Sequence, residues 1–382
     1  MNFQLTEDQL AIQKMVREFT AKEIAPGATE RDLGGDFTPV YEILMKKMAP
    51  LGLLGLSYPK EYGGQGMDHV AFVIAMLEIC RADVSVGAAW SVCLSLGTYP
   101  IYKFGTEAQK QKYLVPLLKG DKLCAFSLTE PNAGSDAAMQ ETTAMLQGDH
   151  YVLNGVKIYC TNAGFADTYI VSAMTDKSKG AKGISAFIVE KGTPGFNFGK
   201  QENTMGIKST IQREIIMTDC KIPRGNLIGK EGEGFKIMMA ALDVGRLGVA
   251  AQGVGVAWGA LDAAIKHSKA RVQFGKPIAA NQGVSFMLAD MATKVELARL
   301  IVLEAAWLSS QGMPYSKEAA MAKMYATDTA MEVTTDAVQI FGGAGYLHDY
   351  PVERMMRDAK ILQIYEGTNQ IQRLVISNFI LK

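Results

Sequence analysis

Hydrophobic and polar positions follow three successive patterns along the chain. Over residues 1–120 apolar residues recur at helical spacing, as with Ile12, Met15, Val16 and Phe19. No alternation of the kind expected for a strand competes in this stretch. The first third is therefore predicted to be an N-terminal helical domain, residues 1–120.

Three threonines mark helix starts within this region. Thr6 and Gln9 have the spacing of a capping box, and Thr106 stands in the same relation to Gln109. Thr38 precedes a proline, which is favoured in the first helical turn. We expect a helix to begin at each of these points.

The pattern changes at about residue 121 to short β-type runs separated by Gly, Asp, Asn and Pro. The runs are LCAFSL, HYVLNGVKIY, TYIVSAM, ISAFIVE and REIIMTDC. Asn154-Gly155 is expected to be a hairpin turn, because both residues tolerate positive φ. Residues 121–228 are therefore predicted to form a central β domain.

Long helical patterns return after Gly229 and define a C-terminal domain, residues 229–382. Asn281 and Ser316 are predicted N-caps, and Gly342-Gly343 is a predicted helix stop. The order of domains is therefore α, β, α. The predicted helices cover 235–270, 282–311, 316–341 and 351–382.

Composition favours a small-molecule substrate. The 39 basic and 39 acidic residues cancel, which gives no electrostatic reason to expect a nucleic acid or an anionic membrane as the main partner. The five cysteines are odd in number, widely spaced and in apolar settings. This is typical of buried thiols in a reducing compartment rather than of a disulfide framework.

Neither the N-terminal segment nor the apolar stretch 84–102 predicts membrane insertion. The N-terminal MNFQLTEDQL lacks the basic and apolar run of a signal or transit peptide. Residues 84–102 carry no charge, but their Ser, Thr, Gly and Pro content favours a buried helix and turn over a membrane span. We expect a cytoplasmic protein or, for a processed chain, an equivalent reducing lumen such as the mitochondrial matrix.

Several common catalytic motifs are absent. The chain contains no GxGxxG, Walker loop, HExxH, CxxC or GxSxG. The four histidines are scattered, so no metal site is predicted. Classical dinucleotide, metal and serine-hydrolase interpretations therefore lose most of their support.

Other segments combine glycines with polar groups, and each has an ordinary structural alternative. LTEPNAGSDAA (128–138) is either a turn or a ligand loop, and RVQFGKP (271–277) places an arginine that is either solvated or anion-binding. QIFGGAGY (339–346) has glycines that allow close approach of a phosphate. In IYEGTNQI (364–371), Glu366 is a lone acid among apolar residues, which is either a surface group or a base with raised proton affinity.

Taken together, these segments resemble the acyl-CoA dehydrogenase family, and most closely its short-chain, butyryl-CoA branch. The resemblance implies an α+β multi-domain fold: an N-terminal helical domain, a central β-barrel-like domain and a C-terminal four-helix bundle. It also implies FAD, an acyl-CoA substrate, electron-transferring flavoprotein as partner, and a homotetramer. The matching stretches are LTEPNAGSDA, KIYCTNAGFAD, MGIKSTIQ, LDVGRLGVAAQGVG, RVQFGKPI, QIFGGAGY with MMRDAKI, and IYEGTNQIQ.

The resemblance also implies roles for individual residues. Glu366 corresponds to the base that removes the α-proton, while the β-hydride goes to the flavin. Some relatives, such as the isovaleryl type, carry the base at the position of Gly245, which cannot abstract a proton. The implied cofactor-binding residues, some of them acting across a subunit boundary, are Phe126, Leu128, Thr129, Gly134, Ser135, Tyr159, Thr161, Arg271, Phe274, Gln282, Gln339, Gly342, Gly343, Thr368 and Gln370.

The implied substrate site leaves the acyl group open. Trp90 is expected to shorten or reshape the acyl pocket, and Tyr159 stands where many relatives have Trp. The uncharged stretch 84–102 lacks an arginine for a distal carboxylate, so short straight, branched or alicyclic acyl groups are favoured. The remaining implied substrate-binding residues are Ser135, Asp243, Arg246 and Gly367; Asp243 and Arg246 also have the spacing of an intrahelical ion pair.

Two other interpretations stay open. An acyl-CoA oxidase or an enoyl-CoA reductase would use the same scaffold, and the sequence does not determine the direction of the reaction. A DNA-associated binding protein of the same superfamily would be expected to carry a basic stripe and possibly a disabled base. The neutral charge balance and the presence of Glu366 argue against that interpretation.

Overall fold

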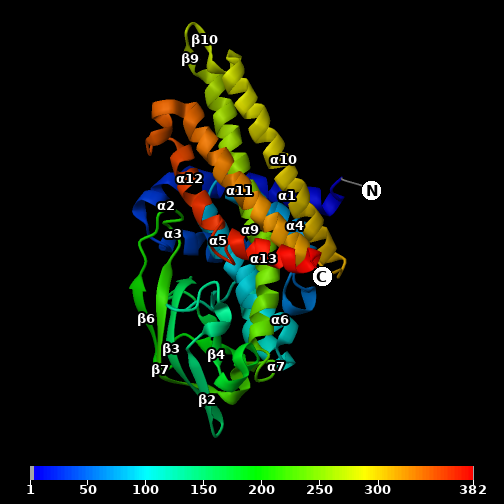
Figure 1. The fold of residues 1–382 in the computed structure, drawn as a ribbon, viewed down its shortest axis with the longest axis vertical. Coiled ribbons are helices and arrows are strands. Elements are labelled where there is room, and N and C mark those ends of the chain that lie inside the picture. Colours follow the sequence, from blue (N-terminus) through cyan, green and yellow to red (C-terminus); the bar gives the residue numbers. More distant parts are fainter. Residues whose placement is uncertain (1–3, 382) are drawn as a thin grey trace.

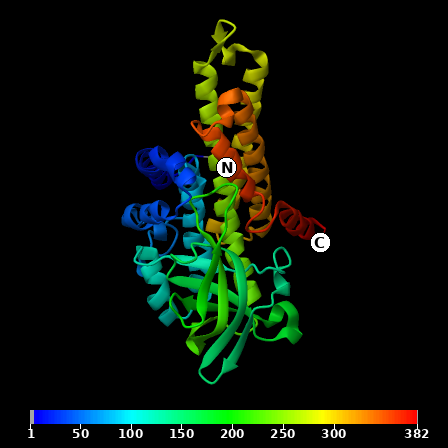
Figure 2. The ribbon, with the colours of Figure 1, turned by 90° about the vertical axis from the view of Figure 1, so that its left-hand side faces the viewer.

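A computed structural model describes residues 4–381 and confirms the order α, β, α (Figure 1). The helices of the N-terminal part lie beside the middle of the long helix α9, between the sheet and the far end of the C-terminal helices (Figures 1 and 2). A short π-helical segment, Val92–Gly97, connects α5 to α6. The helices are α1 (Glu7–Phe19), α2 (Ala28–Gly34), α3 (Thr38–Glu42), α4 (His69–Cys80), α5 (Val84–Ser91), α6 (Thr98–Phe104), α7 (Glu107–Gln109) and α8 (Val115–Lys119).

The predicted helix starts are confirmed. Both capping boxes are present: the side chains of Thr6 and Thr106 each accept a hydrogen bond from the glutamine amide three residues on. Helix α3 begins at Thr38, whose backbone N–H donates to the carboxylate of Asp36. Local side-chain to backbone bonds therefore set these helix ends, as the sequence pattern indicates.

Within residues 4–381, two helical stretches are long and apolar enough to cross a membrane. They are Val84–Phe104 and Gly234–Ala270, and 94% and 83% of their most apolar windows are buried inside the protein. Core helices of globular proteins have the same length and composition. The burial therefore agrees with the predicted buried helix and turn at residues 84–102.

The central part is one twisted eight-stranded sheet in the order β6-β7-β3-β2-β4-β5-β8, with β1 also paired to β4. Strands β1 and β4 run parallel, and β4 and β5 form a regular antiparallel pair buried on both faces. The strands are β1 (Cys124–Ser127), β2 (Thr143–Gln147), β3 (His150–Thr161), β4 (Thr168–Met174), β5 (Ile184–Glu190), β6 (Phe196–Gln201), β7 (Gln212–Pro223) and β8 (Leu227–Ile228).

The predicted hairpin at Asn154-Gly155 is wrong. Strand β3 continues through both residues, and the hairpin turn lies earlier, at Gly148-Asp149 between β2 and β3. At Asn154-Gly155 the pairing with β7 shifts register, and the Asn154 side chain accepts from the backbone N–H of Asp219 at 2.8 Å. The positive φ of Gly155 therefore makes a bulge rather than a chain reversal.

The C-terminal helices differ from prediction at two points. The single helix expected over 351–382 is broken after α12, and the break contains Glu366. Ser316 is not an N-cap; it is the first residue of α11 and its hydroxyl donates to Asp243. The helices are α9 (Gly234–Ala270), α10 (Gln282–Ser310), α11 (Ser316–Phe341), α12 (Pro351–Leu362) and α13 (Asn369–Ile380), with the hairpin β9 (Val272–Gln273) and β10 (Lys276–Pro277) after α9.

Charged groups of α12 bind the three parts of the chain together. The Arg357 guanidinium lies 2.6 Å from the Asp32 carboxylate in α2. The Asp358 carboxylate accepts a hydrogen bond of 2.5 Å from the backbone N–H of Ile207, in the loop between β6 and β7. Helix α12 and the turn that follows it are thus held against both other parts of the molecule.

Candidate active site

Glu366 lies in a strained turn between α12 and α13. Its φ is +53°, and Gly367 follows at +92°. A positive φ is costly for a residue with a long side chain, and such strain is concentrated at functional sites. The Thr368 side chain caps α13 by accepting from the backbone N–H of Ile371 at 3.2 Å. The turn therefore stops one helix, presents Glu366 and starts the next helix.

The Glu366 carboxylate packs against α9 at Gly245, where the lack of a side chain leaves space for it. A methyl group built on Gly245 would lie 2.0 Å from Glu366 Oε2 and 2.9 Å from the Leu96 side chain. Oε2 is buried and has no hydrogen-bond partner within residues 4–381. Gly245 therefore leaves the space that this oxygen occupies, and the oxygen is left free to accept a proton.

Burial sets the proton affinity of this carboxylate. Desolvation raises the pKa of Glu366 to about 7, and the positive charges of Lys323 and Arg246 oppose that rise. Burial also lowers the pKa of Lys323, against the effect of the Glu366 charge. A carboxylate with this pKa is a stronger base than an exposed glutamate and is still substantially ionised near neutral pH.

An apolar cluster connects Glu366 to the start of the sheet. Leu96, whose side chain lies beside Gly245 as the Glu366 carboxylate does, packs with Val92 and with Ala241 and Leu242 of α9. The predicted cofactor residues Phe126 and Leu128, at and just after β1, pack against the same cluster, and both are half-buried. The structure therefore brings these two residues into the neighbourhood of Glu366.

The loop after β1 is held open by a buried ion pair. Lys157 is fully buried, and its ammonium donates to the Leu128 carbonyl at 3.0 Å and to the Glu130 carboxylate at 2.7 Å. The backbone N–H of Ile158 donates to the Thr129 carbonyl at 2.9 Å. Gly134 and Ser135 are exposed beyond this anchor, and a methyl group on Gly134 would meet nothing within 4 Å.

Strand β3 supplies the other predicted residues at this end. Tyr159 has a φ of +56° and its side chain is 63% exposed, although Cys160 beside it is buried. The Thr161 hydroxyl donates to the Gln212 side chain at 2.8 Å. An exposed aromatic ring, an apolar wall and an open glycine loop are groups that suit a flat heteroaromatic ligand. The residues present therefore fit a flavin ring.

The remaining predicted cofactor residues lie at the opposite end of the bundle. Arg271 immediately precedes β9 and Phe274 lies in the turn of the β9–β10 hairpin, which is far from the turn between α12 and α13 (Figure 1). The Phe341 ring stacks on His267 at 4.0 Å, which places the end of α11 beside the end of α9. Phe274 is 98% exposed. The residues grouped at this end, all exposed, are Arg271, Phe274, Gln282, Gln339, Gly342 and Gly343.

One chain therefore does not bring all the predicted cofactor residues together. Gln370 is exposed on α13 and Thr368 is half-buried in the strained turn, so both belong to the Glu366 end. The two ends of the bundle are separated by most of the length of α11 (Figure 1).

The intrahelical ion pair expected at residues 243 and 246 is present. Arg246 and Asp243 are 2.6 Å apart, and the other Asp243 oxygen accepts from the Ser316 hydroxyl at 2.7 Å. Arg246 is 6% exposed, and its Nε has no partner within residues 4–381. Gly367 lies in the same region, since the Arg246 charge acts on Glu366.

The expectation for Trp90 needs correction. Its indole is fully buried, donates to the Leu53 carbonyl at 3.1 Å and packs edge-on against Phe72. The side chain from this helical stretch that lies beside Gly245, together with the Glu366 carboxylate, is Leu96 instead. The bulky ring is therefore part of the N-terminal core rather than a plug beside the carboxylate, because its N–H is satisfied by a backbone group of that core.

Sequence reasoning missed three residues of this site. Leu96 was hidden in an uninterrupted apolar stretch and carried no distinguishing signal. Lys323 did carry a recognisable signal in the sequence, because it is a charged residue on the buried stripe of α11 that includes Ala319 and Ala326. Gln252 is a buried amide on α9 that accepts a hydrogen bond from the Tyr365 hydroxyl.

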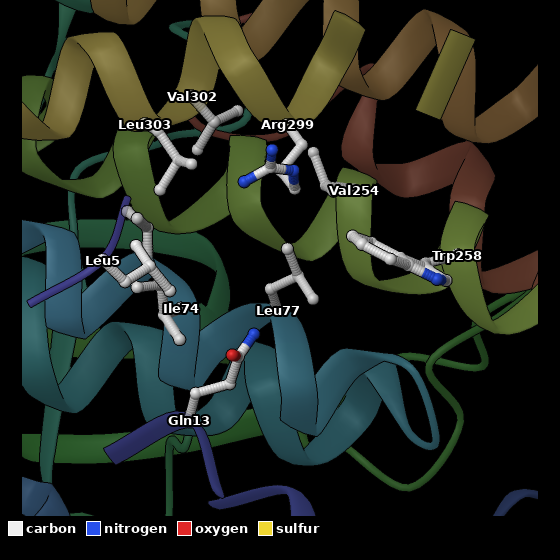
Figure 3. Close-up of a pocket in the computed structure, with 10 residues that line it drawn as sticks. Leu5, Gln13, Ile74, Leu77, Val254, Trp258, Arg299, Val302 and Leu303 are labelled. Atoms are coloured by element: carbon white, nitrogen blue, oxygen red, sulfur yellow. The ribbon is translucent and has the colours of Figure 1, made fainter. Parts of the chain in front are cut away.

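A separate pocket lies between α1, α4, α9 and α10 (Figure 3). Its accessible volume is about 30 Å³, room for roughly one or two water molecules. Its walls are mainly Leu, Ile and Val side chains, and its one charged group, Arg299, is paired with Glu296 at 2.6 Å. The pocket lacks both the size and the acid–base groups of a substrate site.

Comparison with known proteins assigns the chain to a family. Models of the acyl-CoA dehydrogenase N-terminal, middle and C-terminal domains match residues 6–121, 125–220 and 232–381. The chain belongs to the acyl-CoA dehydrogenase family. The resemblance inferred from the sequence motifs is thereby confirmed, together with the fold it implied.

The individual relatives include dehydrogenases and a reductase subunit. The short-chain specific acyl-CoA dehydrogenase of Clostridium acetobutylicum is 50% identical over 382 residues, which is 100% of both chains. The solved structure of butyryl-CoA dehydrogenase from Megasphaera elsdenii has a TM-score of 0.97 at 50% identity and covers 100% of both chains. Subunit CarC of the caffeyl-CoA reductase-Etf complex of Acetobacterium woodii is 46% identical over 378 residues, 99% of both chains.

Proposed function

We propose that this protein is a FAD-dependent acyl-CoA dehydrogenase in which Glu366 removes the α-proton of a short-chain, branched or alicyclic acyl-CoA. The observation that carries the proposal is the buried, unpartnered Oε2 of Glu366, which faces the apolar cluster around Leu96. A thioester α-hydrogen is a weak acid, so its removal needs a base of raised proton affinity where water is excluded. Glu366 meets both conditions.

The strained turn also supplies a backbone N–H group. The backbone N–H of Glu366 makes no hydrogen bond to any group within residues 4–381. An N–H fixed beside the base is suited to bind the thioester carbonyl oxygen as negative charge develops on it. Asp243 and Arg246, with Ser135 and Gly367, are proposed to hold the CoA part, and the unpartnered Nε of Arg246 supports this role.

FAD, when bound, supplies the acceptor for the β-hydride. Phe126, Leu128, Thr129, Tyr159 and Thr161 would flank its ring at the Glu366 end, together with Gly134, Ser135, Thr368 and Gln370. The residues grouped at the far end of the bundle would hold the pyrophosphate and adenine of a cofactor bound mainly by a second copy of the chain. This separation supports an oligomer, and the oligomer we propose is a homotetramer. Arg271 would offer a planar fork of donors to phosphate.

A reductase is the second candidate function. The relative CarC belongs to a caffeyl-CoA reductase-Etf complex, so one scaffold of this family is associated with the reverse chemistry and with electron-transferring flavoprotein. We propose electron-transferring flavoprotein as the partner of this chain, and a cytoplasmic location or an equivalent reducing lumen. An acyl-CoA oxidase would be recognised by rapid reaction of its reduced flavin with oxygen.

Anaerobic titration of the purified flavoprotein tests the proposal. Butyryl-, isobutyryl-, hexanoyl-, glutaryl- and cyclohexanecarboxyl-CoA are added separately while oxidised-flavin absorbance is followed. We expect a short straight, branched or alicyclic thioester to bleach the flavin and glutaryl-CoA not to do so. Bleaching by none of the five, with bound flavin present, would contradict the dehydrogenase assignment.

A further inference from the structure

Lys323 is a buried cation on α11, whose other buried residues are mostly alanines and threonines. Its side chain is 0% exposed and lies on the buried stripe of α11. Removing an ammonium from water costs several kcal/mol, which is recovered only when good partners receive its hydrogens. A helix that needed only to pack would place an apolar residue here.

The partners of Lys323 lie in the turn that carries Glu366. Its Nζ donates to the Gly367 carbonyl at 2.8 Å and to Asn369 Oδ1 at 2.9 Å. The Gln372 side chain donates to the same Gly367 carbonyl at 2.9 Å. The backbone immediately after Glu366 is therefore held from two sides, and the lysine supplies the charged contact.

Asn369 extends this contact back to α11. Its Nδ2 donates to the Thr327 hydroxyl at 2.9 Å and to the Asp328 carboxylate at 2.7 Å. Lys323, Thr327 and Asp328 thus bind the first residue of α13 from one turn of α11. The strained φ of Glu366 is maintained by a rigid helix rather than by the turn itself.

The charged groups around Lys323 and Glu366 have a defined arrangement. Lys323 and Arg246 act on Glu366 with positive charge, while Arg246 is itself paired with Asp243. Glu366 and Asp328 act on Lys323 with negative charge, and Tyr365 faces Glu366 as a buried neutral phenol. Lys323 is therefore the cation that acts most strongly on Glu366, and it forms no ion pair with a carboxylate within residues 4–381.

We propose that Lys323 is a positioning residue for Glu366: its ammonium fixes the Gly367 carbonyl, and its charge keeps the buried carboxylate ionised until substrate binds. This inference rests on the proposed function. The proton removed from the substrate α-carbon goes to the Glu366 carboxylate, and Lys323 neither gives nor takes a proton in this step. Without that charge, burial alone would drive Glu366 toward the protonated, inactive form.

The experiment compares Lys323→Met and Lys323→Gln with the wild type. The glutamine variant loses the charge but keeps a donor for the Gly367 carbonyl. Lys294→Met is the control, because it removes a lysine of α10 that pairs with Glu332 on α11 at 2.8 Å, an ion pair that includes no residue of the turn carrying Glu366. Protonation of Glu366 is followed in the holoenzyme by infrared absorbance of the protonated carboxyl, identified as the band that Glu366→Gln abolishes.

The predicted result is an upward shift of the Glu366 protonation midpoint by about one pH unit or more in both Lys323 variants. The acid limb of flavin reduction by a reactive acyl-CoA is expected to shift by the same amount, and Lys294→Met is expected to leave the midpoint in place. An unchanged midpoint in the Lys323 variants would overturn the proposal and leave Lys323 as a structural anchor.

Two features keep the test decisive. If neither Lys323 variant folds, Asn369→Ser removes one acceptor of the ammonium while leaving the lysine in place; we expect a smaller shift in the same direction, and no shift would overturn the proposal. The infrared midpoint requires no turnover. A wild type that is not reduced by any thioester would therefore contradict the proposed function without affecting the measurement on Lys323.

Discussion

Gly245→Ala is the substitution for which the structure gives the clearest magnitude. The added methyl group would lie 2.0 Å from Glu366 Oε2, whereas real contacts of this kind are at least about 3 Å, so the oxygen must withdraw by about 1 Å or more. The methyl group would also lie 2.9 Å from the Leu96 side chain, which closes the other direction of relief. A displacement of about 1 Å at a reacting group costs on the order of 10²-fold in rate.

The assay is anaerobic stopped-flow reduction of the bound flavin by the most reactive thioester of the panel. Helix propensity alone would favour alanine over glycine by about 1 kcal/mol, so a loss of rate would not reflect a weakened α9. Gly283→Ala in α10 is the matched control, because its methyl group meets nothing within 4 Å. We expect a fall of roughly 10²-fold for Gly245→Ala and no change for the control. Equal rates in both variants would refute the placement of Glu366 against α9.

Three further outcomes are expected. Because burial raises the pKa of Glu366 to about 7 and the base must be ionised, flavin reduction should fall as pH decreases through neutrality; a rate that rises on acidification would contradict this sign. Lys157→Met leaves the buried Glu130 carboxylate without its ion-pair partner and should destabilise the protein by about 3–5 kcal/mol. In a denaturant titration, FAD should be released at a lower denaturant concentration than in the wild type. An unchanged unfolding midpoint would argue against Lys157 as the anchor of the loop after β1. Asp243→Asn removes the counter-charge of the buried Arg246 and should weaken thioester binding by roughly 10-fold or more, measured by spectral titration at constant flavin content; unchanged affinity would remove this pair from the substrate site.

The sequence predicted elements where the signal is local. Capping threonines and apolar periodicity gave the helix starts at Thr6 and Thr106 and three of the long C-terminal helices to within about a residue. The Asn154-Gly155 turn failed because a bulge and a hairpin both use positive φ, and only pairing with β7 decides between them. The break around Glu366 was missed because the apolar spacing continues on both sides of it.

Sequence motifs identified the residues of the candidate site, but they did not reveal the contacts that support these residues. Glu366 stands out as a lone acid, yet its approach to Gly245 depends on how α9 packs against a turn more than a hundred residues later in the chain. The role of Lys323 required its partners to be seen, since a lysine in a helix usually faces solvent. Trp90 was misplaced because the apolar stretch gave no indication of which side faces the N-terminal core.

The most direct measurement for the whole account is flavin reduction in Glu366→Gln. The amide keeps the size of the side chain but cannot accept the α-proton. The account predicts that this variant binds FAD and the acyl-CoA with near-normal affinity while single-turnover reduction falls by at least ~10²–10⁴-fold. Reduction at a near-normal rate would contradict it and place the base elsewhere.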